Sequence, residues 1–481
     1  MVVQSDWQLS FDFFGSTVVV VQPSTEQVSS DGGLLPFREL DERLGLTQQF
    51  AAALTDLRQE GYIEHTFLEM TRARIYGILA DYADQNDHDV LRSDPIFKLI
   101  CGRSIDGDHL ASQPTLSRFE NSIGPGCFFA LQDVFLDQFI ASFDKPPTHL
   151  TLDVDLFDDP THGQQQLTFF HGFYGQYQYL PRVITCAEND LVVTVCLLHG
   201  TAHPTLGIQD DLAYVVGRLR QAWPDVRIHL RADSGFGSPV TYEACEQLNI
   251  EYTVGLGMNA CLKKLTDPLL AEALAQWEAT GKPQRLFTSF WYQADSWPAQ
   301  RWVVVKCEAK AEGTNRRAVV TNRPGATVLP DAAYDAYADR GESENRNKEL
   351  KDGLQAERLS DHRYFANLFR LYLHAAAYNL LVHMRRIVAD PPPEAPRQDV
   401  PTEALGGNQR RQYHNRRREH DPLGEGQPCT WRTRFIKVAA CVRQTTRRVV
   451  VTLSSSWPYL DHFRQACQRL LAMLTASPDS G

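Results

Sequence analysis

The first 145 residues begin with a short β-like run and continue with helical periodicity. The run FFGSTVVVVQ near the amino terminus is apolar and β-branched, which favours a strand. From Phe37 to about Ala83, apolar residues recur every three or four positions through RELDERLGL, QFAAALTDLR and HTFLEMTRARIYGILADYAD. This spacing is typical of amphipathic helices. We therefore expect a mostly helical amino-terminal domain over residues 1–145.

The period changes in the next hundred residues. Strand-like runs are HLTLDVD, QLTFFHGFY with QYQYLPRVI, and LVVTVCLLHG, and they are followed by helix, strand, helix and strand signals up to about Gly255. Strands first and strand–helix alternation afterwards predict an α/β core in which helices cover a sheet. We place this core at residues 146–390.

Two further regions follow the strand–helix alternation. Residues 261–317 hold a short helix and three strand-like runs, RLFTSFWYQAD, RWVVVKCEA and RRAVVTNRP, which predict a β-rich insertion within the core. The apolar helix at 367–387 closes the core, and ADPPPEAP has the composition of a linker. Residues 391–481 then form a separate carboxy-terminal module with a strand pair and a last amphipathic helix.

Charge and composition narrow the function classes. The 481 residues carry a net charge of −11, which argues against a general polyanion binder. Residues 397–448, however, hold 12 Lys and Arg against 5 Asp and Glu, and a nucleic-acid-binding protein needs local basic patches more than a basic pI. We expect no membrane span, because no apolar run reaches eighteen residues. The ten scattered cysteines fit reduced thiols in the cytoplasm.

Two predicted strands end in carboxylates. In HLTLDVDLFDD, alternation places Asp153 and Asp155 on the same face of one strand, and in VRIHLRADSGFG a short apolar strand runs into Asp233. Together with a carboxylate on a later helix, such strand-end acids provide the oxygen ligands that hard divalent cations prefer. We expect Asp158 and Asp159 to form a turn before Pro160.

A polar helix follows the β-rich insertion. Tyr337, Arg340, Glu344 and Lys351 in YADRGESENRNKELK are three, four and seven positions apart, so they share one face of an α-helix. By itself this spacing also fits a solvated helix with salt bridges. The acid-bearing strands upstream favour a functional face instead.

These residues resemble the DDE transposases of bacterial insertion sequences, in the branch with a Tyr-x2-Arg-x3-Glu-x6-Lys signature. The signature reads without a gap, and the resemblance extends to SSDGGLLPFRELDERLGL, LASQPTLSRFENS and SDHRYFANLFRLYLHAAAYNLL. It implies an RNase H-like α/β catalytic core, of the ribonuclease H and retroviral integrase type, with a β-rich insertion. It also implies that the helical amino-terminal domain recognises DNA ends and that the carboxy-terminal module contacts DNA.

The resemblance implies phosphoryl transfer on DNA with two Mg²⁺ ions, for which Mn²⁺ can substitute. Asp155, Asp233 and Glu344 are the implied metal ligands. The Asp-x-Thr pattern of many relatives is missing, because Asp155 is followed by Leu156 and Phe157. Asp153 therefore stays open as the alternative first ligand.

Further residues are candidates for DNA contact. Arg340 and Lys351 would bind phosphates near the scissile bond, and Tyr337 would bind a phosphate or stack on a base. The helix beginning at 113 is either the recognition helix of a helix-turn-helix or a packing helix, and Arg118 is its candidate DNA contact. The remaining candidates are Arg416 and Arg417 in the basic run 410–420, and Trp291 and Trp302, which either stack on a flipped base or belong to the core of the insertion.

The sequence thus predicts a transposase that binds the inverted-repeat ends of an insertion sequence and catalyses metal-dependent cleavage and strand transfer. Its partners would be the transposon ends and the target DNA, and it would act as a homodimer in the synaptic complex. It would be located in the cytoplasm of a bacterium, and on the nucleoid when it is bound to DNA. Two alternatives are a structure-specific nuclease or resolvase with the same core and a domesticated transposase that only binds DNA.

Overall fold

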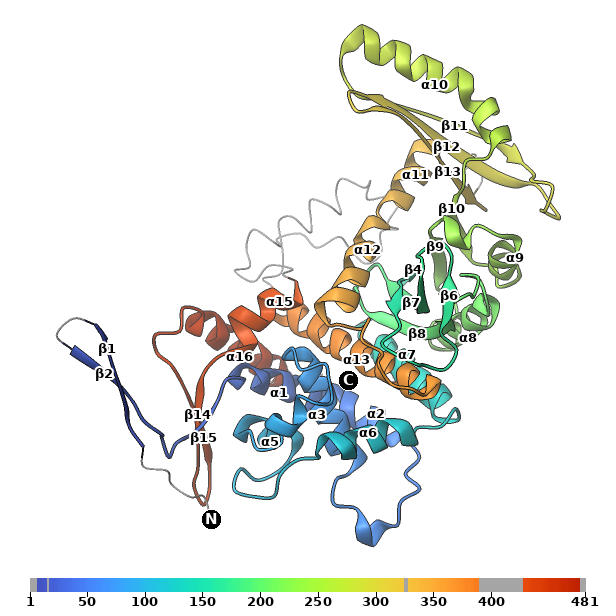
Figure 1. Cartoon of the computed structure of the whole chain (residues 1–481). Coiled ribbons are helices and arrows are strands. Elements are labelled where there is room, and N and C mark those ends of the chain that lie inside the picture. The colour runs from blue at the N-terminus through green and yellow to red at the C-terminus, as the bar shows by residue number, and fades with distance from the viewer. Residues whose placement is uncertain (1–6, 15–16, 324–327, 389–426, 476–481) are drawn as a thin grey trace.

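The computed structural model describes residues 7–14, 17–323, 328–388 and 427–475. They form a mixed α/β fold with one large mixed sheet, a layer of helices beneath it and an arm above it (Figure 1). None of the described helices is both long enough and apolar enough to cross a membrane.

The centre of the large sheet is built from five strands in the order β8-β7-β4-β9-β10. β7 is antiparallel to β4 and β8, whereas β9 is parallel to β4 and β10 is parallel to β9. Parallel strands need a crossover connection. Here α8 connects β8 to β9, and α9 connects β9 to β10. The predicted order of antiparallel strands followed by strand–helix alternation is confirmed, and the mixed sheet is consistent with an RNase H-like core. The elements are β4 (His149–Leu156), β5 (Asp159–Pro160), β6 (Phe169–His171), β7 (Gln176–Cys186), β8 (Val192–His199), α8 (Ile208–Ala222), β9 (Arg227–Ala232), η3 (Ser234–Phe236), α9 (Pro239–Gln247) and β10 (Glu251–Leu256).

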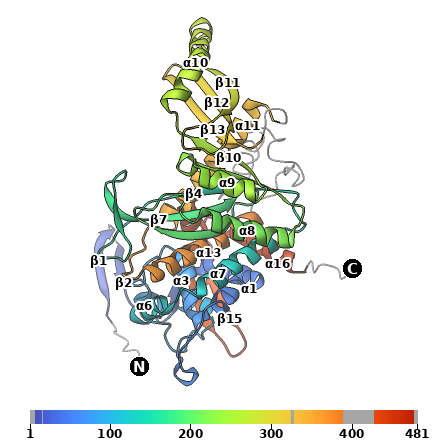
Figure 2. The same ribbon diagram turned by 90° about the vertical axis from the view of Figure 1, so that its right-hand side faces the viewer.

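The predicted β-rich insertion is an extension of the same sheet. It consists of α10 (Ala260–Thr280), β11 (Gln284–Tyr292), β12 (Arg301–Lys310) and β13 (Gly313–Thr321). β13 pairs with β10, so the three strands continue the sheet beyond its parallel edge. Figures 1 and 2 show this arm extending away from the rest of the protein, with α10 along one of its faces.

The amino-terminal helices pack around α13 (Tyr364–Val388), and most of the residues of α13 are buried. Phe50 and Phe119 contact Phe369 of α13, with ring centroids 5.8 and 5.4 Å apart. α13 and α7 also contact β8, so these helices and the sheet share one hydrophobic core. The helices are η1 (Gly32–Leu34), α1 (Leu35–Leu44), α2 (Leu46–Ala52), η2 (Glu60–Tyr62), α3 (Phe67–Leu79), α4 (His88–Leu91), α5 (Pro95–Cys101), α6 (Gln113–Ser122) and α7 (Cys127–Ala141).

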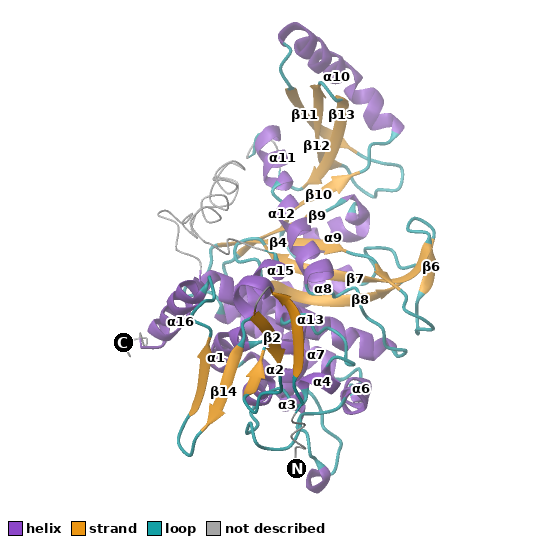
Figure 3. Ribbon diagram, turned by 60° about the vertical axis from the view of Figure 1, so that its left-hand side comes forward, coloured by secondary structure: helices purple, strands orange, loops and turns teal. Residues whose placement is uncertain are grey.

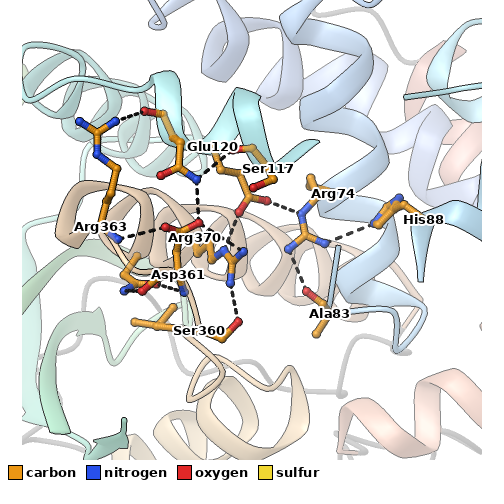
Figure 4. A network of polar contacts seen from close by, with 12 residues as sticks. Arg74, Ala83, His88, Ser117, Glu120, Ser360, Asp361, Arg363 and Arg370 are labelled. Carbon is orange, nitrogen blue, oxygen red and sulfur yellow. Dashed lines mark hydrogen bonds and ion pairs between the residues drawn. The ribbon is translucent and has the colours of Figure 1, made fainter. Parts of the chain in front are cut away.

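A buried ion network joins this helical layer (Figure 4). Glu120 of α6 accepts hydrogen bonds from Arg74 of α3 at 2.7 Å and from Arg370 of α13 at 2.5 Å, and all three side chains are buried. Burial raises the pKa of Glu120, but the two guanidinium groups outweigh burial and hold the pKa below its usual range. Removing one partner of such a network leaves a buried charge uncompensated, so α6 is fixed tightly to α3 and α13.

Segments from the two ends of the chain form a second, three-stranded sheet. β14 (Ala440–Gln444) lies between β3 (Gln27–Ser29) and β15 (Val449–Leu453). Beside it, Arg432 donates hydrogen bonds to the carbonyls of Ile78 and Leu79, and Phe37 packs against Trp431 and Phe435. The remaining elements are β1 (Leu9–Phe14), β2 (Thr17–Val21), α11 (Pro330–Ala338), α12 (Gly341–Lys348), η4 (Glu349–Gly353), α15 (Pro428–Trp431), η6 (Arg432–Ile436) and α16 (Leu460–Thr475).

Candidate active site

Two carboxylates lie at the carboxyl ends of neighbouring strands. Asp155 is the penultimate residue of β4, and Asp233 directly follows β9, which is parallel to β4. Asp233 also caps η3 and accepts a hydrogen bond from the backbone nitrogen of Gly235 at 2.8 Å. The carboxyl edge of an α/β sheet, where these side chains lie, is the usual position of a site in this architecture.

The signature residues are carried by two helices rather than one. We predicted a continuous helix from Tyr337 to Lys351, and this prediction is wrong in its detail. α11 ends at Ala338, Arg340 occupies the position before α12, and Lys351 lies in the π-helical turn η4. The backbone nitrogen of Arg340 bonds to the carbonyl of Tyr337, which tightens the chain between the helices.

Arg340 connects the strand acid with the helix acid. Its guanidinium donates to Asp155 Oδ2 at 3.2 Å and to Glu344 Oε1 at 2.6 Å. It also lies over the ring of Tyr337, 5.7 Å from the centroid. Arg340 is nearly buried and so is Asp155, whereas Glu344 is more than half exposed. The guanidinium therefore joins residues far apart in the sequence across one partly open site.

The three predicted acids, Asp155, Asp233 and Glu344, are here called the acidic triad. Burial raises the pKa of Asp155 to about 6; Arg340 opposes this shift, and the charges of Asp233 and Glu344 increase it. The charges of Asp233 and Glu344 therefore both act on the carboxylate of Asp155. Among the described residues, no group of three or more Asp, Glu, His or Cys side chains is arranged closely enough to hold a metal ion. The donors of the triad are nevertheless all carboxylate oxygens, which is the ligand type that a hard divalent cation prefers.

Asp153, the alternative first ligand, is committed elsewhere. Both of its oxygens accept hydrogen bonds from Arg231 of β9, at 2.6 and 2.7 Å, and both side chains are buried. Arg231 also donates to the carbonyl of Ala336 at the end of α11. The pair Asp153–Arg231 thus attaches the signature helices to the sheet. The geometry favours Asp155 as the residue that faces the site.

Lys351 is held by an ion pair beside the triad. Its Nζ lies 2.7 Å from Asp158 Oδ1 and 3.6 Å from Glu357 Oε2. Asp158 also accepts a hydrogen bond from Gln176 of β7 at 3.2 Å. The sequence predicted only a turn at Asp158, because a contact with Lys351, far along the chain, leaves no local pattern.

Gly255 of β10 makes the site compact. A Cβ atom at this position would lie 2.7 Å from Tyr337 Oη, 2.8 Å from the backbone nitrogen of Ser234 and 3.1 Å from the carbonyl carbon of Asp233. A side chain cannot fit at such distances without moving the backbone of Asp233 or the ring of Tyr337. The absence of a side chain at Gly255 therefore allows the signature helices to approach the second acid closely.

Three other DNA-contact candidates, Arg118, Trp291 and Trp302, lie on elements that do not carry the triad. Arg118 is exposed on α6 and donates a hydrogen bond to Thr115. The other face of α6 packs inward through Leu116, Phe119 and Glu120. The connection Gly102–Ser112 between α5 and α6 is too long for the short turn of a helix-turn-helix. In the arm, Trp291 and Trp302 form a cross-strand pair with centroids 5.4 Å apart. Trp302 packs against the small core shared with α11, whereas Trp291 is 59% exposed. Arg416 and Arg417 lie outside the described residues.

Three comparisons with known proteins bear on this arrangement. A family model described as "Transposase DDE domain group 1" matches residues 11–397. Among the solved structures that match is one described as a cryo-EM structure of piggyBac transposase synaptic complex with hairpin DNA. It is 14% identical, and the match covers 75% of this chain and 77% of that chain with a TM-score of 0.37. No curated protein matches the sequence.

Proposed function

Because the chain belongs to the DDE transposase family that this model describes, domain group 1, we propose that it is the transposase of a bacterial insertion sequence. In this proposal it binds the inverted-repeat ends of its element, cleaves DNA there and joins the ends to target DNA. It acts as a homodimer in the synaptic complex, within the cytoplasm and on the nucleoid. The family supports DNA cleavage and joining in general, and the finer assignments rest on the site described above.

The observation that carries the proposal is the bridge made by Arg340. It links Asp155 at the end of β4 to Glu344 on α12, beside Asp233 at the end of β9. Acidic groups gathered at the carboxyl edge of a sheet around one guanidinium are costly for stability, because like charges repel and burial penalises them. A site with that cost is typical of a functional role.

We assign the acidic triad as the residues that would hold Mg²⁺, with Mn²⁺ as a substitute. When bound, two such ions supply activation of the attacking oxygen and neutralisation of charge on the leaving oxygen. The chain's own part is to position the DNA. Arg340 and Lys351 are paired with carboxylates in the protein alone. We propose that both turn to phosphates flanking the scissile bond, with Arg340 suited to bidentate contact, and that Tyr337 contacts the same strand.

The proposal is tested with DNA that carries the inverted repeats flanking the gene. Asp155→Asn, Asp233→Asn and Glu344→Gln should each lower Mg²⁺-dependent cleavage by at least a thousandfold while end binding stays within about threefold. Asp331→Asn, an exposed carboxylate on α11, is the matched control and should cleave normally. Full cleavage by a triad variant contradicts the assignment of that residue. Cleavage without joining to target DNA by the unaltered protein would instead identify a nuclease or resolvase.

A further inference from the structure

The hairpin formed by β6, its turn and the start of β7 carries an unusual number of exposed aromatic rings. We call residues Phe169–Tyr177, with the sequence FFHGFYGQY, the aromatic hairpin. Phe173 at its turn is 86% exposed, Tyr177 60% and Phe170 51%, and Phe169 and Tyr174 are each 43% exposed. Figure 3 shows β6 projecting from the sheet, away from the helical layer.

The rings form two groups, because neighbouring residues of a strand point to opposite faces of the hairpin. Phe170 and Tyr177 lie with centroids 5.6 Å apart, and Phe173 and Tyr174 lie 5.1 Å apart. His171 packs edge-on against Tyr174 at 5.0 Å. Exposed apolar rings gathered on both faces of one hairpin are costly in water, and such apolar surface marks a binding site more often than not.

The turn of the aromatic hairpin lies beside the acidic site. Burial, and then the carboxylates of Asp158 and Asp233, raise the pKa of Tyr174, so its ring lies in the field of these acids. Two residues further on, Gln176 donates to Asp158, which is the partner of Lys351. The aromatic surface is therefore connected to the lysine that we assign to phosphate binding.

A pocket opens at the base of the aromatic hairpin, with a volume of about 650 Å³. Gln176 and Tyr177 line it from the hairpin, and Gln166, Thr168 and His362 line it from the facing segments. Amide, hydroxyl and imidazole groups can both donate and accept hydrogen bonds. Gln176, Thr168, His362 and Gln166 each have at least one internal partner already. Their remaining donor and acceptor positions are the ones that would match the edge of a nucleobase, next to rings that match its face.

Resting on the proposed function, we propose that the aromatic hairpin and this pocket bind unpaired nucleobases of the DNA strand that lies at the acidic triad. Stacking on exposed rings tolerates any base, because every base has a π-face. The position favours this occupant over a protein surface, since Gln176 of the aromatic hairpin bonds to Asp158, the partner of the lysine that we assign to a phosphate of the same strand. The aromatic hairpin is distinct from Trp291, which lies on the arm at the far side of β10.

The test measures binding of single-stranded and duplex DNA by the full chain, with Ca²⁺ in place of Mg²⁺ so that strands stay intact. The probes are a fluorescent oligothymidylate with one 2-aminopurine and a duplex of equal length with blunt ends. Phe173→Ala and Tyr174→Ala remove two exposed rings, and Tyr62→Ala removes an exposed ring of η2, far along the chain from the aromatic hairpin, as the matched control. A melting curve accompanies each variant.

We expect each hairpin variant to bind the single strand about tenfold more weakly, with loss of the 2-aminopurine quenching. Tenfold corresponds to about 1.4 kcal/mol, which is within the range for one base on one aromatic ring. Duplex affinity and melting temperature should stay unchanged, and Tyr62→Ala should match the unaltered protein.

Three outcomes would overturn the inference, and they differ in whether the proposed function also fails. Normal single-strand binding by both folded hairpin variants removes the aromatic hairpin as a base-binding surface and leaves the proposed function standing. A change of oligomeric state in sedimentation, with normal DNA binding, would assign the surface to a contact between copies of the chain. If the unaltered protein binds neither probe, the proposed function fails together with the inference.

Discussion

Asp153 and Asp155 lie two residues apart on β4, and only the replacement of Asp153 by asparagine should destabilise the protein at pH 7. Asp153→Asn leaves the buried guanidinium of Arg231 without its counter-charge. Asp155→Asn removes a carboxylate whose charged form is disfavoured by burial. The two substitutions are chemically identical, so each serves as the control for the other.

The magnitudes follow from the surroundings of each carboxylate. Breaking a buried ion pair by removing one partner costs about 3–5 kcal/mol. With an unfolding entropy of roughly 2.1 cal/mol/K per residue, the 481 residues give about 1 kcal/mol/K, so Asp153→Asn should lower Tm by about 3–5 °C. For Asp155, a folded pKa of about 6 against an ordinary 3.8 means that ionisation on folding costs on the order of 3 kcal/mol above pH 6. Asp155→Asn should therefore be neutral or stabilising at pH 7.

The sign of the pH dependence is a further check. Between pH 3.8 and 6 the folded protein retains a proton on Asp155 that the unfolded chain releases, so stability falls as pH rises through this window. The advantage of Asp155→Asn should therefore be present at pH 7 and disappear near pH 4. Thermal melts of both variants in EDTA, between pH 4 and 7, measure it. Loss of cleavage in a normally stable Asp153→Asn, with full cleavage in Asp155→Asn, would refute the reasoning and move the first ligand to Asp153.

Two other predictions follow from packing near the site and on the arm. Gly255→Ala should lower cleavage at least tenfold and destabilise the fold by about 1–3 kcal/mol, because the added Cβ would meet Tyr337. Gly257→Ala is the control, since the space around Gly257 is open. Equal activity of the two variants would contradict the close approach of Tyr337 to Gly255. Trp302→Ala should lower Tm, because Trp302 packs on the core shared with α11. Trp291→Ala should leave Tm unchanged, because Trp291 is exposed, and should slow the joining of a pre-nicked substrate more than it slows nicking. Normal joining by Trp291→Ala would show that Trp291 does not stack on a base.

Much of the sheet and the placement of the triad could be predicted from the sequence, for a physical reason. Alternation in β4 and the apolar run of β9 are local patterns, and a sheet brings the ends of parallel strands to one edge. Asp155 and Asp233 could therefore be proposed as strand-end acids of one site, and the structure shows that their strands are parallel neighbours. The spacing from Tyr337 to Glu344 likewise marked the helix acid, although the helix breaks at Arg340.

The sequence did not reveal the side-chain contacts between residues that are far apart along the chain. Nothing near Asp153 indicates that Arg231 will bind it, so both strand acids were open as ligands. Arg340 was assigned to phosphate, and its bridge between two carboxylates depends on how α12 lies over β4. The aromatic hairpin was read only as strand, because its β propensity is genuine. Residues 169–177 contain more aromatic side chains than two short strands can bury, and this number was the sequence signal for an exposed aromatic surface.

The sheet that joins β3 to β14 has a consequence for biogenesis. Phe37, near the start of the chain, is covered by Trp431 and Phe435, and the carbonyls at the end of α3 are bonded by Arg432. While the chain is being synthesised, these groups stay uncovered until residues 431–435 have been made. Partly folded chains with exposed apolar surface aggregate and are degraded. A chain that stops before residue 427 would therefore leave Phe37 and the end of α3 uncovered, and we expect such a fragment to be degraded.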